Sequence, residues 1–144
     1  MEFFSVLIDK YSQINPGWRK IKPQPQQWAG FGAGRSGLAF NWGFRSQNRL
    51  SVELYIDTGD VDENKRIFDQ LSKTRKKIDS ELPGISWERL EGRRASRIAV
   101  YKDIGASIKS LPKDDYPKVI EWAVAMMNKF TNIFGHYIKN LQNM

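Results

Sequence analysis

The way the spacing of apolar residues changes between Leu50 and Tyr101 constrains the fold of this chain most strongly. The segment reads LSVELYIDT, then GDVDENKRIFDQLSKTRKKIDSEL, then ISWERL and ASRIAVYK. Apolar residues alternate in the first piece, as in a strand, and recur every three or four residues in the second, as in a helix. The last two pieces are short strands on either side of the turn Glu91-Gly92-Arg93-Arg94. The order predicted is strand, helix, strand, strand.

A further strand precedes this segment. Apolar side chains alternate with small or polar ones from Leu38 to Arg45, and Ser46-Gln47-Asn48 supplies a turn before Leu50. This pattern predicts an antiparallel hairpin. Since two hairpins account for all of these strands, a parallel sheet is disfavoured.

The helix in the middle has recognisable ends. Asp60 stands three residues before Glu63, the spacing at which two side chains cap free backbone amides at a helix start, and Pro83-Gly84 ends the helix. Its inward stripe is predicted to be Ile67, Leu71, Thr74, Ile78 and Leu82. Its outward face is predicted to be basic, with Lys65, Arg66, Lys73, Lys76 and Lys77.

Helices are also predicted at both ends of the chain. Apolar residues recur at helical spacing from Phe3 to Ile14, and a wide apolar stripe predicts a last helix from about Asp114 to Gln142. At ~1.5 Å per residue the last helix is ~40 Å long, which leaves its end available to pack on another chain. The Pro- and Gly-containing segment from Trp18 to Gly37 is predicted to be a long loop with little regular structure.

Together these elements predict an α+β fold, with an antiparallel sheet of about four strands, a crossing helix and terminal helices packed on one face. The 144 residues are expected to form a single domain, with a core at about 37–104 and the long helix at about 114–142.

Composition limits the function classes. Cysteine is absent, which excludes thiol nucleophiles and Cys-ligated zinc. No window approaches the ~20 apolar residues of a membrane span, and the start lacks a signal peptide, so a cytoplasmic protein without a membrane partner is expected. Lys and Arg outnumber Asp and Glu by 23 to 16, for a net charge of +7. A basic balance favours encounters with polyanions, nucleic acid first.

Several motifs of the central stretch occur in the same order in a known family. They are VELYIDT, the pair Asn64-Lys65, FDQL, KKID, ISWERL and SRIAVY. In this order they resemble the family catalogued as domain of unknown function 4268, over roughly Gly37 to Ile104 and more loosely in the terminal helix. The resemblance implies a prokaryotic domain that often follows a segment related to restriction-type nucleases. Such a neighbour does not by itself confer chemistry.

Two segments match the sequence motif of a known catalytic or binding site but lack the secondary structure that the motif requires. Asp57 followed by Glu63-Asn64-Lys65 matches a metal-dependent nuclease, but Glu63 is better explained as a helix cap. The run Gly32–Gly37 matches the dinucleotide fingerprint, but a Pro-Gln loop enters it and a strand leaves it. A loop in which Arg35 holds an anion remains open.

The lone His136, without Cys partners, is interpreted as structural, with a role either in packing or in adding favourable charge at a helix C-terminus. No catalytic residue, metal site or cofactor is assigned.

Two clusters are candidates for binding. The first is a basic corner near Pro83, formed by Lys73, Lys76, Lys77, Arg93, Arg94 and Arg97. The candidates for base stacking are Trp28, Phe31, Trp42 and Trp87, although Trp42 and Trp87 also suit the core. The second cluster, Glu53, Tyr55, Glu88 and Arg97, could meet across the sheet as a ligand-reading face or as a cross-strand ion network.

The leading hypothesis is therefore a non-catalytic module that binds DNA or RNA, alone or as an accessory to a nuclease or defence component. Two alternatives remain. One is a cryptic metal-dependent nuclease that uses Asp57 and Glu53. The other is an assembly domain that forms a homodimer through the C-terminal helix.

Overall fold

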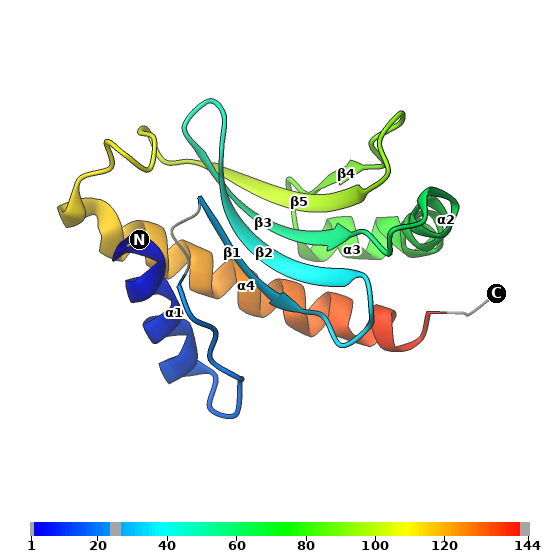
Figure 1. Ribbon diagram of the computed structural model, residues 1–144, viewed down its shortest axis with the longest axis horizontal. Coiled ribbons are helices and arrows are strands. Elements are labelled where there is room, and N and C mark those ends of the chain that lie inside the picture. The colour runs from blue at the N-terminus through cyan, green and yellow to red at the C-terminus, as the bar shows by residue number, and fades with distance from the viewer. Residues whose placement is uncertain (1, 24–26, 142–144) are drawn as a thin grey trace.

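In the computed structural model, which describes residues 2–23 and 27–141, five antiparallel strands form one curved sheet in the order β1-β2-β3-β5-β4 (Figure 1). The strands are β1 (Trp28–Gly32), β2 (Leu38–Arg45), β3 (Arg49–Ile56), β4 (Ser86–Glu88) and β5 (Ser96–Asp103). The helices are α1 (Glu2–Ile14), α2 (Val61–Ser72), α3 (Arg75–Glu81) and α4 (Tyr116–Lys139), with the 3-10 turn η1 (Lys113–Asp115) before α4. The predicted α+β fold is confirmed.

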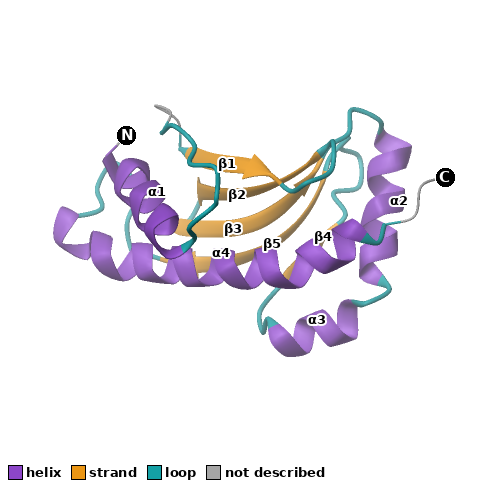
Figure 2. Ribbon diagram, turned by 90° about the horizontal axis from the view of Figure 1, so that it is seen from below, coloured by secondary structure: helices purple, strands orange, loops and turns teal. Residues whose placement is uncertain are grey.

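Helices cover one face of the sheet. Both α1 and α4 lie against this face, and α4 runs lengthwise beneath the strands (Figure 2). The fully buried Trp42 of β2 donates its indole N–H to the carbonyl of Ala123 in α4 at 3.0 Å. Because side chains alternate along each strand, the residues next to Trp42 in sequence face the other way. In the described part of the chain no helix lies on that second face, which we call the open face.

Strand β1 corrects one prediction. The segment from Trp18 to Gly37 was predicted to lack regular structure, but Trp28–Gly32 pairs with β2, with Ala29 opposite Trp42 and Phe31 opposite Phe40. Its sequence WAGFG is too rich in glycine to show a strand pattern. Glycine is needed at Gly30 because a Cβ there would lie 1.8 Å from the Asn41 side-chain oxygen. The sheet therefore has five strands rather than about four.

The helix predicted to run to Pro83 is divided in two. Lys73 and Thr74 donate their backbone N–H groups to carbonyls three residues back, at 3.3 and 3.1 Å, and the Thr74 hydroxyl bonds the Leu71 carbonyl at 2.8 Å. Such local bonding competes with the helical ladder, and α3 then turns away from α2 (Figure 2). Ile78 and Leu82 are still buried, so the apolar stripe continues across the break and hides it in the sequence.

The start of α2 is capped by Asp60 as predicted, but the predicted reciprocal hydrogen bond from the Glu63 side chain is replaced by another. Asp60 accepts from the Glu63 backbone N–H at 3.2 Å. The backbone N–H of Asp60 is bonded by the Thr58 hydroxyl at 3.3 Å, and the Glu63 side chain instead lies 4.0 Å from Arg66. The capping box is therefore completed by Thr58.

The end of α4 packs within its own chain. Phe134 and Ile138 are buried, and Phe134 contacts the Trp87 ring with centroids 6.4 Å apart. This side of the helix end is therefore buried within the chain, whereas His136 and Lys139 on its other side are exposed. Residues 24–26 of the predicted loop and residue 142 of the predicted helix lie outside the described residues. No described helix has the length and apolar character needed to cross a membrane.

We predict that Trp42→Phe lowers the free energy of unfolding by about 1–3 kcal/mol, because it removes a buried hydrogen bond and leaves a void. Urea unfolding measures the change. The control, Trp28→Phe, changes a tryptophan that is 48% exposed and is expected to cost less than about 0.5 kcal/mol. Equal losses in the two variants would contradict the assignment of Trp42 to the core.

Candidate functional site

Charged and aromatic side chains gather on the open face. The strand register places Tyr55 of β3 opposite Arg97 of β5, and Arg97 opposite Glu88 of β4. Glu53 lies two residues before Tyr55 and faces the same way. The structure therefore brings together the four residues of the predicted polar cluster. Its further members are Arg45, Arg49, Ser51 and Tyr101.

Glu53 is the buried centre of this cluster, with no exposed surface. Arg45 donates from Nη2 to Glu53 Oε1 and from Nε to the Ser51 hydroxyl at 3.2 Å. The second oxygen of Glu53 lies 3.8 Å from Arg97 Nε and has no hydrogen-bond donor among the described residues. Burying a carboxylate is costly unless it is paired, so Glu53 requires both arginines to stay close above it.

A glycine makes room for Arg45 to lie across the sheet. A Cβ at Gly43 would come 3.1 Å from the Arg45 guanidinium, which is tighter than ordinary contact. Burial and the nearby positive charge of Arg97 lower the pKa of Arg45. The lowered pKa reflects a guanidinium held over the sheet instead of extended into water.

A second carboxylate, Glu88, holds the other half of the cluster. Arg97 donates to its Oε1 at 2.8 Å and Tyr101 donates to its Oε2 at 2.6 Å. Burial would raise the pKa of Glu88, but these hydrogen bonds outweigh it and the pKa is lowered. Burial and the same hydrogen bond raise the pKa of Tyr101. Glu88 therefore stays ionised and fixes Arg97 and Tyr101 in place.

Two aromatic residues extend the open face. Trp28 of β1 lies opposite Gly43, beside Arg45, and is the exposed member of the predicted stacking residues. The Arg49 guanidinium lies over the Tyr101 ring, 4.3 Å from its centroid. The other stacking candidates face the helix side of the sheet, where Trp42 is fully buried and Phe31 and Trp87 are half-buried.

The basic corner is only partly assembled. Lys73, Arg93 and Arg94 line one hollow between α2 and the turn that joins β4 to β5. Lys76 and Lys77 are exposed on α3 and do not line it. Carboxylates enter the same hollow, among them Asp69 and Glu91, and both bind Arg89. The continuous positive surface expected from the sequence is therefore interrupted.

Arg94 already has a strong partner. It donates to both oxygens of Asp57, at 2.9 and 2.7 Å. This bidentate pair holds the pKa of Asp57 below its usual range. Lys73 and Arg93, in contrast, have no ion-pair partner within the described ranges, so these two side chains remain available to a ligand in the hollow.

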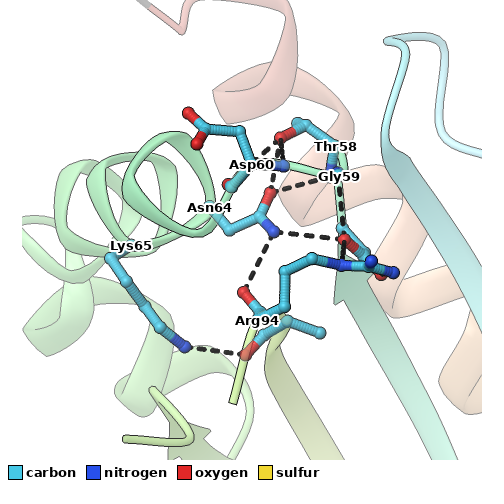
Figure 3. Close-up of polar contacts among 8 residues, drawn as sticks. Thr58, Gly59, Asp60, Asn64, Lys65 and Arg94 are labelled. Carbon is cyan, nitrogen blue, oxygen red and sulfur yellow. Dashed lines mark hydrogen bonds and ion pairs between the residues drawn. The ribbon is translucent and has the colours of Figure 1, made fainter. Parts of the chain in front are cut away.

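The motif pair Asn64-Lys65 fastens this corner to the sheet (Figure 3). Asn64 is fully buried; it accepts from the Thr58 N–H at 2.7 Å and donates to the Arg94 carbonyl at 3.0 Å. Lys65, expected on the outward basic face, is instead 9% exposed. Its ammonium donates to four oxygens of the turn and of β5, those of Arg89, Leu90, Ala95 and Ser96. The exposed basic face predicted for Lys65 is therefore wrong.

The remaining candidates have local explanations. Arg35 donates to the Leu141 carbonyl at 3.2 Å, so it contacts the end of α4. His136 is exposed near the end of α4, with its ring 5.5 Å from that of Tyr137.

Glu53 lies on β3 and Asp57 follows the end of that strand, four residues on and about 13 Å away between Cα atoms in extended chain. Each already binds an arginine. This geometry does not favour one cation shared by both. Across the described ranges, no group of three or more His, Cys, Asp or Glu could hold a metal ion.

Comparison with protein families gives one match. The family described as "Domain of unknown function (DUF4268)" matches residues 1–138, which confirms the resemblance and extends it from the central stretch to nearly the whole chain. No curated protein and no solved structure matches significantly.

We predict that Asn64→Ala lowers the free energy of unfolding by about 2–3 kcal/mol, because it removes a fully buried side chain and leaves the Thr58 N–H and the Arg94 carbonyl without partners. Chemical denaturation measures the loss. Gln70→Ala, on the same helix, is the matched control and is expected to change stability by less than about 0.5 kcal/mol. A cost for Asn64→Ala no larger than the control would show that the motif does not fasten the corner.

Proposed function

Because the chain belongs to the DUF4268 family, whose description names no activity, we propose a function from the geometry of the open face. The protein is a non-catalytic module that binds nucleic acid, DNA or RNA, across this face. The observation that carries the proposal is that arginine and aromatic side chains lie together on one face of the sheet. No described helix covers that face (Figures 1 and 2).

The aromatic side chains suit bases. Trp28 is 48% exposed at one edge of the face, and Tyr101 lies on β5 opposite Ser51, with Arg49 over its ring. Bases stack on aromatic rings and on guanidinium planes without regard to sequence, at about 1–3 kcal/mol per base. A single strand with unpaired bases matches this arrangement better than a duplex.

The charges suit phosphates. In the central ion pair the side chain of Arg45 is 31% exposed and that of Glu53 is fully buried, so a ligand meets the cation first. The sheet curves so that the β2–β3 and β4–β5 turns rise on the side of the open face, away from α4 (Figure 1). Arg49 lies next to one turn and Arg93 lies in the other. A strand laid between the turns would meet arginine at both ends.

The basic corner has a secondary part in this proposal. Arg93 and Lys73 supply phosphate contacts at the end of the face, because neither has an ionic partner in the described chain. Arg94 and Arg97 contribute less, since Asp57 and Glu88 hold them. Lys76 and Lys77 act at long range through the net charge of +7.

The test is fluorescence anisotropy with labelled single strands of about 12 nucleotides, DNA and RNA, over a range of salt. We predict salt-sensitive binding. Arg49→Ala with Arg93→Ala should weaken it and lower the slope of log affinity against log salt by about 1.4, or about 0.7 for each phosphate that the variant no longer neutralises. Trp28→Ala should weaken binding about 5- to 150-fold.

The matched control is Lys129→Ala with Lys139→Ala, which removes the same charge from exposed positions on α4. This double variant should bind nearly as tightly as the wild type. The proposal is wrong if the wild type shows no salt-sensitive binding at low salt, or if both double variants lose the same affinity.

A further inference from the structure

A groove with apolar walls lies between α1 and α4, on the side of the sheet opposite the open face (Figure 2). The apolar residues that line the groove include Val6, Ile14, Ile120 and Val124. Val6 and Ile14 are 44% and 49% exposed, and they are two of the four exposed large apolar side chains in the described chain. Such a concentration of exposed apolar surface at one place is typical of an interaction site.

The two walls of the groove carry matching patterns of opposite charge. On α1 the stripe consists of Val6, Lys10 and Ile14, which are four positions apart. A cation therefore lies between two apolar residues. On α4 the stripe is Pro117, Glu121, Ala125, with an anion in the middle at the same spacing. Residues four apart lie on one helix face, about 6 Å from each other along the axis.

Neither central charge is satisfied within the chain. Lys10 and Glu121 are both exposed, and in the described residues neither has an ion-pair or hydrogen-bond partner through its side chain. Nearby charges do pair, as Lys113 does with Glu2 at 3.1 Å. Apolar surface around an unpaired cation on one helix and an unpaired anion on the other is an arrangement that complements itself across a twofold axis.

We propose that this groove is the interface between two copies of the chain. About a twofold axis, the α1 stripe of each copy packs on the α4 stripe of the other, so that Lys10 of each copy pairs with Glu121 of the other. The contact buries Val6 and Ile14 of both copies. It does not use the end of α4, where Phe134 and Ile138 pack within the chain.

This interface leaves the open face of each copy uncovered, because α1 and α4 lie on the other side of the sheet. A dimer would therefore present two open faces. Self-association does not require a nucleic-acid ligand, so it is tested without one and stands or falls separately from the function proposed above.

The experiment is sedimentation equilibrium of the full chain from about 1 µM to about 200 µM. The wild type is expected to dimerise. Lys10→Glu and Glu121→Lys should each weaken association at least about tenfold, because each homodimer then contains two like-charged contacts. An equimolar mixture of the two variants should recover the wild-type affinity, since both contacts in the mixed dimer are again between opposite charges.

Lys139→Glu is the control, since it makes the same change of charge at an exposed position outside the groove and should dimerise like the wild type. Recovery on mixing also shows that both variants are folded. A wild type that stays monomeric over the whole range overturns the proposal. So do single reversals that leave association unchanged, or a mixture that does not recover.

Discussion

The buried carboxylate of Glu53 is the constraint on which the open face depends. It lies on a sheet face without a covering helix, yet it is fully buried, and the side chains of Arg45 and Arg97 are drawn over it. A carboxylate removed from water must be compensated by nearby positive charge. Glu88 then fixes Arg97 and Tyr101 in turn. With this network in place, helices need to pack on only one face of the sheet. On the other face the arginine side chains are held in fixed positions, and this is the surface to which we assign the proposed function.

A second polar anchor sets the far end of that surface. Lys65 is a buried cation whose partners in the described chain are backbone carbonyls and one hydroxyl. Four well-placed oxygens together can replace water around an ammonium, and they come from the β4–β5 turn and its continuation. Asn64 joins the same turn to the loop after β3. Asn64 and Lys65, neighbours on α2, thus fix the position of the turn that carries Arg93 and Arg94.

The sequence predicted the elements with strong periodicity and missed those set by particular contacts. The alternation from Leu38 to Ile56 defined the central hairpin, and it put Glu53 and Tyr55 on one face, where the structure has them. The same alternation also places Arg45 there, so this member could have been found. The strand WAGFG could not, because its two glycines hide the strand pattern and Gly30 is there for the close approach of Asn41. The burial of Lys65 could not be predicted either. A lysine in an amphipathic helix is normally exposed to solvent, and the partners of Lys65 come from a turn about 30 residues later in the chain.

The five tryptophans allow a direct test of which face binds. Trp28 lies on the open face, whereas Trp42 is buried beneath α4 and Trp122 lies on α4 near Lys102. The indole N–H signals of ¹⁵N-labelled protein can be followed as a single-stranded oligonucleotide is added. The account predicts that the Trp28 signal shifts and that those of Trp42 and Trp122 stay in place. A shift of Trp122 without any change at Trp28 would contradict it.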